Sequence, residues 1–246
     1  MTGASKPKAL VIGVGAELGL GAALSMRFAR EGYHVFISGR TLHRLQHIAS
    51  LIEQSGGSAA PFVCDATNEQ SVIDLFDAIE ESKGIALDLI VFNVGNNMPG
   101  NIREMESTYF TDAWKTICFS GFLVAREVTR RLLPGNVTLV FTGASASLRG
   151  RPGFGAFNSA KSALRTFAQA LAKEYGKEGL HVCHVVIDGG IAGQKWLDRN
   201  DGKMSQEQRK HLISLDGLTD TYWNLHLQKP EAWSFEIDLR TALESW

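Results

Sequence analysis

The sequence predicts one α/β domain in which a doubly wound parallel sheet carries helices on both faces. With 246 residues, 44% of them apolar and 21% charged, the chain can bury a full core. Short apolar runs alternate along the chain with stretches of helical spacing, as in βαβ units. No linker rich in Pro or Ser and no internal repeat interrupts this alternation, so we expect a single domain over residues 1–246.

The first element is the continuous apolar run 9–12, which fits a strand covered on both faces and ends at a glycine. The elements that follow are assigned in the same way, from apolar runs for strands and apolar spacing for helices. The expected strands cover 9–12, 33–38, 60–64, 87–92, 137–141, 181–187 and 233–239, and the expected helices cover 22–30, 42–52, 72–79, 109–133 and 159–175. The last strand is expected to close one edge of the sheet.

The segment 192–230 breaks this rhythm because it is polar and charged, and we expect it to form a substrate lid within the domain. Its aromatic and histidine side chains, Trp196, Trp223 and His226, have two interpretations. They could line a substrate pocket beneath the lid, or they could simply pack, which is the commoner role of aromatic residues.

Composition and charge exclude several classes of protein. The net charge of −1 leaves no basic surplus for nucleic acid, and no apolar run approaches the ~20 residues of a membrane helix. The polar start, Met1 to Lys8, does not resemble a signal peptide, so a cytoplasmic protein is expected. Cys64, Cys118 and Cys183 are predicted to be reduced core residues, and the histidines show no metal-ligand spacing.

A glycine-rich turn follows the first strand and precedes a helix. The spacing Gly-x-Gly-x-x-Gly fails because position 18 is Leu, whereas Gly15-x-x-x-Gly19-x-Gly21 fits. Glycines allow the backbone to approach a pyrophosphate, whose charge is met by free N–H groups at the helix N-terminus. The alternative is a tight strand-to-helix turn without a ligand, but its place in a βαβ series favours dinucleotide binding.

The end of the second expected strand favours NADP over NAD. An NAD site would carry an Asp or Glu there, whereas this chain has Arg40, with Arg44 one turn later. An Arg can pair with a 2′-phosphate, although it could equally be a solvated residue at a helix start. Glu17 argues in the opposite direction, because its carboxylate would repel a phosphate near the same ribose.

Asp65 after the third strand, Asn93-Val94-Gly95 after the fourth, and Gly189 with Ile191 add further matches in the right order. Together with the glycine turn, these residues resemble the short-chain dehydrogenase/reductase family over nearly the whole chain to about Ile191. The resemblance implies a Rossmann-type fold, a nicotinamide cofactor, a small-molecule substrate and a homodimer or homotetramer. The residues implied to contact the cofactor are Gly15, Gly19, Leu20, Gly21, Arg40, Asp65, Asn93, Gly95, Lys161, Gly189 and Ile191.

The catalytic positions depart from the family's pattern. The family's Tyr-x-x-x-Lys reads Phe157 to Lys161 here, so the Lys is present and the Tyr is absent. The family's Ser position falls on Ala144, with Ser145 beside it, and the Asn position falls on Cys118. Carbonyl reduction needs a proton as well as a hydride, and Phe has none to give. Lys161 keeps its implied second role of binding the nicotinamide ribose.

Four side chains could replace the missing donor, although a structural role is preferred for each of them. Ser145 or Ser147 could orient a carbonyl, Lys161 could relay a proton, and Asp188 could act as an acid if burial kept it protonated. We therefore expect an NADP-dependent oxidoreductase that interconverts a carbonyl and an alcohol with a non-standard catalytic set. The alternatives are a non-catalytic cofactor-binding sensor or partner subunit, and a fold retained only for assembly.

Overall fold

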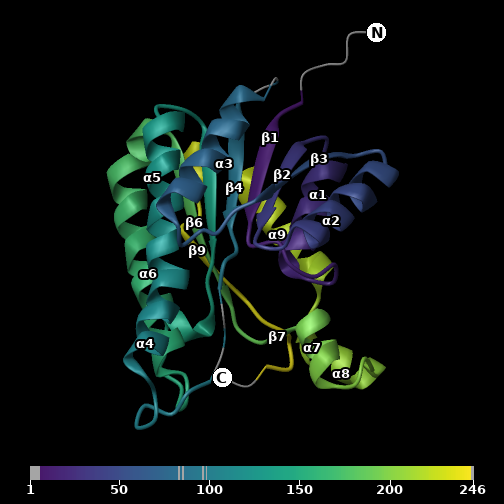
Figure 1. Ribbon diagram of the computed structural model, residues 1–246, viewed down its shortest axis with the longest axis vertical. Helices are drawn as coiled ribbons and strands as arrows, with labels where there is room; N and C mark the ends of the chain where they lie inside the picture. Colours follow the sequence, from purple (N-terminus) through teal and green to yellow (C-terminus); the bar gives the residue numbers. More distant parts are fainter. Residues whose placement is uncertain (1–5, 83, 85, 96, 98, 245–246) are drawn as a thin grey trace.

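A computed structural model describes residues 6–82, 84, 86–95, 97 and 99–244, so most of the polar start, residues 1–5, lies outside it. Seven parallel strands form one sheet, as the sequence predicts, and their order is β3-β2-β1-β4-β5-β6-β9 (Figure 1). The strands are β1 Lys8–Ile12, β2 His34–Gly39, β3 Ser58–Val63, β4 Leu87–Phe92, β5 Val137–Thr142, β6 Leu180–Ile187 and β9 Glu236–Leu239. A separate pair, β7 Gly190–Ile191 and β8 Leu212–Ile213, lies beyond β6.

Helices cover both faces of this sheet, with one apolar core on each side (Figure 1). On one face lie α3 Glu69–Glu81, α4 Ser107–Trp114, α5 Ser120–Leu132 and α6 Gly155–Tyr175. On the other face lie α1 Leu20–Arg30, α2 Leu42–Gln54 and α9 Leu215–His226, while the short helices α7 Gln194–Arg199 and α8 Gln206–Lys210 stand at one end. The central strands are buried on both faces and are mostly apolar, which explains the continuous runs in the sequence.

The helix expected over 109–133 is present but is interrupted by a π-helical turn, Lys115–Phe119, between α4 and α5. Such turns insert one residue per turn and are frequent at functional sites. Helix α6 begins at Gly155, four residues earlier than expected, so Phe157 and Lys161 lie one turn apart on a single helix. Cys64, Cys118 and Cys183 are free and buried, as expected.

Part of the segment expected as a lid belongs to the core. Helix α9 packs against α1, and within it Trp223 contacts the rings of Phe28 and Tyr33. His226 is hydrogen-bonded to Tyr33 at 2.8 Å and to Thr138 at 3.0 Å. Of the two interpretations of Trp223 and His226, packing is therefore the one observed.

The strand order reverses between β1 and β4, since β1 is followed in the chain by β2 on one side and lies beside β4 on the other. In open α/β sheets, ligands bind outside the carboxyl ends of the strands at such a switch point. The glycine turn after β1 and Asn93 after β4 both lie at this position.

Candidate cofactor and active site

The glycine turn is held so close to its neighbours that side chains cannot be added at two of its positions. A Cβ at Gly21 would lie 2.8 Å from the carbonyl oxygen of Gly13 and 3.0 Å from the Cα of Val14. Gly13 itself has a φ of +97°, in the region that favours glycine. The Cβ of Gly15, in contrast, would point into open space. The turn therefore leaves a bare backbone surface facing outward at Gly15.

Helix α1 begins directly behind this surface, and its N-cap Gly19 offers no side-chain cap to the first N–H groups. Free N–H groups at a helix N-terminus attract anions such as a pyrophosphate. Asn93 fixes the turn to β4, because its backbone N–H donates to Ile12 O at 2.8 Å and its Nδ2 to Gly13 O at 3.2 Å. The residues present thus fit the pyrophosphate of a dinucleotide.

Asp65 and Arg40 lie together at the ends of the neighbouring strands. A backbone N–H and a hydroxyl of Thr67 donate to one carboxylate oxygen of Asp65, at 3.0 Å and 2.8 Å. The backbone hydrogen bond is the largest cause that lowers the pKa of Asp65, with smaller contributions from the charges of Arg40 and Lys115. Asp65 is therefore ionised and able to accept a hydrogen bond, as an adenine amino group requires.

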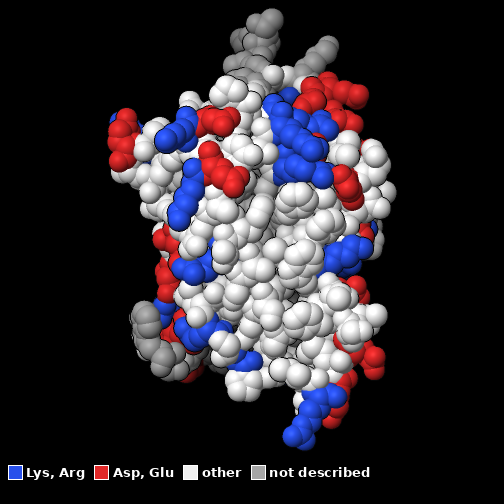
Figure 2. Space-filling model, turned by 90° about the vertical axis from the view of Figure 1, so that its left-hand side faces the viewer, with Lys and Arg blue, Asp and Glu red and all other residues white. Residues whose placement is uncertain are grey.

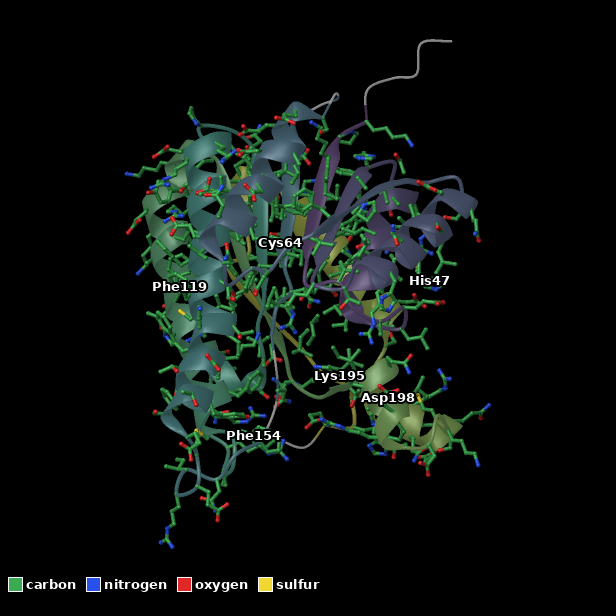
Figure 3. The ribbon with its side chains drawn as sticks, viewed as in Figure 1. His47, Cys64, Phe119, Phe154, Lys195 and Asp198 are labelled. Carbon is green, nitrogen blue, oxygen red and sulfur yellow. The ribbon has the colours of Figure 1, made fainter. Side chains whose placement is uncertain are left out.

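A cavity of about 350 Å³ adjoins the glycine turn. Its lining comes from the turn, from α2 and from α7: Gly15, Ala16, Glu17, His43, Arg44, His47, Ile48, Gln194 and Asp198. Glu17 is paired in it with His47 at 2.7 Å, and both side chains are about half exposed. Figure 3 shows His47 on the side of α2 and Asp198 on α7 below it. Sequence reasoning missed the two histidines, whose spacing of four residues puts them on one face of α2.

Lys161 is buried at the carboxyl ends of β4 and β5. Its Nζ donates to the carbonyl oxygen of Thr142 at 2.7 Å and would lie 3.5 Å from a Cβ at Gly95. Burial, with a smaller contribution from the charge of Lys195, lowers the pKa of Lys161 to about 8. An ammonium group so close to neutrality can change its protonation state at physiological pH.

The three positions that depart from the family's pattern lie on segments that pack together, and one of them is beside Lys161. Phe157 is buried, and its ring centre lies 5.9 Å from Nζ of Lys161. Ala144 packs against the same core cluster as Phe157, and α6 also packs against the π-helical turn that carries Cys118. Burial raises the pKa of the Cys118 thiol, which is a weak hydrogen-bond donor. This wall of the site is therefore largely apolar.

The interpretation of Asp188 as a protonated acid is wrong. Burial alone would raise its pKa, but hydrogen bonds from Ser145 and Arg149, together with the charges of Arg149 and Arg240, lower the pKa below its usual value. Arg149 Nη2 contacts both carboxylate oxygens, at 2.8 Å and 3.0 Å. Asp188 is thus an ionised carboxylate that accepts hydrogen bonds.

The two candidate serines have partners within the protein. The buried Ser147 donates to the carbonyl oxygen of Ala144 at 2.7 Å. Ser145 interacts with Asp188 and contributes to the lowered pKa of that carboxyl group. Both candidate serines therefore have an interaction within the protein.

Gly189 and Ile191 form the segment that follows β6. Gly189 has a φ of +146°, and a Cβ there would lie 3.3 Å from Oε2 of Glu244, so the end of the described chain returns to this segment. The backbone N–H of Gln194 donates to Leu18 O at 2.7 Å, which docks the start of α7 on the glycine turn. Trp196 approaches the neighbouring Gly190 from α7. The expected cofactor residues thus line one continuous edge.

A buried cluster behind Lys161 was not predicted. His184 on β6 is fully buried, and its Nδ1 is hydrogen-bonded to Glu236 at 2.9 Å, while Arg165 pairs with the same carboxylate at 2.6 Å. Burial lowers the pKa of His184 to about 4, so the imidazole is neutral. The three residues are far apart in the sequence, and no motif connects them.

Two further observations concern the described residues only. They contain no group of three or more His, Cys, Asp or Glu side chains arranged to hold a metal ion. None of their helices is both long and apolar enough to cross a membrane.

Comparison with known proteins identifies the family. The short chain dehydrogenase family matches residues 8–195. Gluconate 5-dehydrogenase of Gluconobacter oxydans (strain 621H) is 30% identical over 217 residues, which cover 88% of this chain and 78% of that protein. The chain therefore belongs to the short-chain dehydrogenase/reductase family of oxidoreductases, and its fold is of the Rossmann type.

Solved structures agree with this conclusion. A short-chain dehydrogenase from Rhodopseudomonas palustris has 33% sequence identity and a TM-score of 0.80, with 95% of this chain and 98% of that chain covered. An alcohol dehydrogenase from Thermococcus sibiricus, complexed with 5-hydroxy-NADP, has 19% identity and a TM-score of 0.84, with 98% of each chain covered. At that identity the second likeness concerns the fold alone.

Proposed function

We propose that the protein binds NADP(H) and transfers a hydride between the cofactor and a small organic substrate. The observation that carries this proposal is the placement of Lys161, buried beside Gly95 at the edge where the glycine turn and Asn93 also lie. Burying a lysine is costly unless its ammonium group has a function or a partner. Asp65, Asn93 and Lys161 together argue against a fold retained only for assembly.

Different residues of the chain would bind different parts of the cofactor. The bare backbone at Gly15 and the N-terminus of α1, from Gly19 through Leu20 and Gly21, would receive the pyrophosphate. Asp65 would accept a hydrogen bond from the adenine, and Lys161 would bind the nicotinamide ribose. Gly189 and Ile191 would border the nicotinamide. When bound, NADP(H) would supply or accept the hydride.

The preference for NADP over NAD is supported by charge around the 350 Å³ cavity. Arg44 lines this cavity, Arg40 lies at the end of β2, and no Asp or Glu takes the place of Arg40. Glu17, which would repel a phosphate, is instead paired with His47. A protonated His47 would offset the negative charge of Glu17 beside a 2′-phosphate.

A carbonyl reaction at this site lacks the family's usual proton donor. Phe157 cannot donate, Asp188 is ionised, and Ser145 and Ser147 are engaged elsewhere. For a carbonyl or alcohol substrate the proton would have to pass through Lys161, whose pKa of about 8 suits a general acid. The curated relative described above is a dehydrogenase, which supports the hydride transfer itself.

Titration with NADPH and NADH, followed by fluorescence, tests the proposal. We expect saturable binding with a preference for NADPH, and Lys161→Met should weaken it about 10–100-fold, since hydrogen bonds to charged groups are worth ~1.5–3 kcal/mol. Lys173→Met, an exposed position on the same helix, is the matched control and should bind normally. Absence of binding by both cofactors would refute the proposal.

A second candidate function is a non-catalytic cofactor sensor or partner subunit, and the loss of the tyrosine at Phe157 favours it. Screening ketones, aldehydes and alcohols with the natural protein beside Phe157→Tyr separates the two candidates. Turnover by the natural protein at ordinary enzyme rates excludes the sensor. Turnover by the Tyr variant alone would instead favour it.

A homodimer or homotetramer would form through the face of α5 and α6. Figure 2 shows that the middle of this face is largely uncharged, with charged side chains at its upper end and along both of its margins. Phe110, Trp114 and Phe122 are exposed on α4 and α5, and Phe122 contacts Phe167 of α6. Such exposed aromatic residues are typical of association surfaces. The mass in solution, measured by sedimentation equilibrium, tests this proposal.

A further inference from the structure

We infer that the substrate of this site is an iminium ion, with a C=N⁺ group in place of the carbonyl. The inference rests on the proposed function and specifies its substrate class. Hydride addition to an iminium carbon needs no proton, which is what this site is least equipped to supply.

The protic side chains expected around the reacting atoms are replaced by Phe157, Ala144 and Cys118, on three segments that pack together. The candidates for replacement have other interactions, since Ser147 donates to a backbone carbonyl and Ser145 lowers the pKa of the neighbouring Asp188. Among these candidates, Lys161 is the one left with a proton to give near neutral pH. A carbonyl oxygen would therefore meet an apolar wall.

The two reactions place opposite demands on such a wall. Hydride addition to a carbonyl creates negative charge on oxygen, which needs hydrogen-bond donors and finally a proton. Hydride addition to an iminium forms a C–H bond with the hydride's electron pair, while the C=N π pair becomes a lone pair on nitrogen. The reduced nicotinamide becomes oxidised, no proton enters or leaves, and the positive charge moves from the iminium to the nicotinamide ring. Hydride addition to a carbonyl instead creates two opposite charges from two neutral groups. A poorly solvating site favours the step that creates no new charge.

Aromatic rings near the site can bind a cation. The ring centre of Phe157 lies 5.9 Å from the nitrogen of Lys161, and that of Phe154 lies 4.9 Å from the guanidinium carbon of Arg151. Both rings thus already lie near positive groups in the manner of cation–π pairs. The carboxylate of Glu244, beside Gly189, adds negative charge near the place expected for the nicotinamide.

An uncharged cavity adjoins the same end of α6. It has a volume of about 480 Å³ and is lined by Pro99, Gly100, Asn101, Ile102 and Gly153. Gly100 is hydrogen-bonded to Gly153 and bridges to Phe154, so the cavity lies next to the start of the helix that carries Phe157. Figure 3 shows Phe154 across the lower end of the molecule from Lys195 and Asp198 of α7. The volume suits a small bicyclic amine.

The positive charge of Lys161 repels a cationic substrate, so the rate of iminium reduction should depend on pH. The groups that face Lys161 are Lys195 of α7, the neutral His184 of β6, the carbonyl of Thr142 and the ring of Phe157. As the pH rises through about 8, Lys161 loses its proton and the repulsion falls. Iminium reduction should then become faster, whereas carbonyl reduction with Lys161 as the acid should become slower.

The experiment uses the full chain and a permanently charged probe, N-methyl dihydroisoquinolinium. Its reduction by NADPH is measured from pH 6.5 to 8.5, with the reaction in the absence of protein subtracted, beside the ketone tetralone. Independently of turnover, binding of the probe is compared by calorimetry with binding of its uncharged carbon isostere, a methyl dihydronaphthalene. Phe157→Tyr, which keeps the ring and adds only a hydroxyl, is measured in parallel.

We expect the natural protein to reduce the iminium probe at least tenfold faster than tetralone and to bind the probe ~2–30-fold tighter than the isostere. Phe157→Tyr should raise tetralone reduction about 100-fold or more, as an added general acid does, with iminium reduction within about threefold of the natural rate.

Faster reduction of tetralone than of the probe by the natural protein would overturn the inference. So would equal binding of the probe and its isostere, or a rate on the probe that falls with rising pH. Failure of NADPH and NADH to bind would be recognised separately, because it refutes the proposed function itself.

Discussion

The cofactor half and the catalytic half of the site lie along one edge of the same sheet, but they recognise their ligands by different means. In the cofactor half, Gly13 and Gly21 are required by backbone contacts, and Gly15 leaves the backbone bare. In the catalytic half, the properties of the site depend on individual side chains, above all Phe157 and Lys161. The first half keeps the family's pattern and the second departs from it.

The difference teaches how far a fold can predict a reaction. Backbone geometry constrains the glycines of the turn so strongly that a cofactor site can be recognised in the sequence even where the catalytic residues have changed. A proton donor, in contrast, is lost by the removal of a single oxygen, as in Phe157, without any disturbance to the helix that carries it. Family membership therefore supports cofactor binding more firmly than it supports a particular substrate.

Substitution at two glycines of the cofactor half should have two different effects, one on stability and one on NADPH affinity. Gly21→Ala forces a Cβ against backbone atoms at 2.8 Å and 3.0 Å, and we expect a loss of about 2 kcal/mol in the free energy of unfolding, or ~4–8 °C in Tm. Gly15→Ala, the control, has open space around its Cβ and should keep the Tm while losing NADPH affinity. Equal loss of Tm in both variants would contradict this account.

The catalytic half should show an acid-sensitive ion pair at Asp188. Because the pKa of Asp188 is lowered in the folded protein, its carboxylate contributes stability above the unfolded value of about 3.8, and the contribution is lost as the pH falls through the folded value. We expect Asp188→Asn to cost about 1–2 kcal/mol at pH 7, a modest figure because Arg149 is half exposed.

Urea unfolding at several pH values measures this effect. The difference between the natural protein and Asp188→Asn should begin to narrow as the pH falls toward the unfolded value of about 3.8 and should disappear below the lowered folded value, where the protonated carboxyl group resembles the amide. Asp112→Asn, an exposed position on α4, serves as control and should be neutral throughout. A difference that stays constant from pH 7 to pH 3 would show that the effect is not electrostatic.

The smallest expected effect concerns Glu17 in the cofactor half. Replacing its carboxylate in Glu17→Gln should tighten NADPH binding about 1.5–5-fold, the range of a half-exposed charge interaction of ~0.2–1 kcal/mol. NADH, which lacks the 2′-phosphate, should bind as before. Glu53→Gln at the far end of α2 is the control, and an equal gain for NADPH and NADH would count against a phosphate near Glu17.

The fold could be predicted from the sequence because its signals are local. Apolar runs and helical spacing predicted the alternation of strands and helices. The spacing of the glycines predicted where along the chain the cofactor would bind. The π-helical turn at Lys115–Phe119 could not be foreseen, since it interrupts a stretch whose periodicity looks helical throughout. Helix α9 was also missed, because polar residues around Trp223 conceal the side that packs on α1.

The site was predictable in its positions and less so in its interactions. Lys161 and Phe157 could be placed from motif spacing alone. The partners of Asp188, namely Ser145, Arg149 and Arg240, come from other segments and meet only in the folded chain. A carboxylate's protonation depends on such partners, which explains why Asp188 was a candidate acid in the sequence and an ionised group in the structure.

The return of the chain's last described residues to the site has a practical consequence for anyone who purifies this protein. Arg240 is paired with Asp188, and Glu244 lies against Gly189. An affinity tag fused after Trp246 would begin three positions beyond Glu244 in the sequence, and so would follow closely on residues that contact the segment whose ligands are to be measured. Tags for the titrations are better placed before Met1, since β1 enters the sheet at the end opposite to the site (Figure 1).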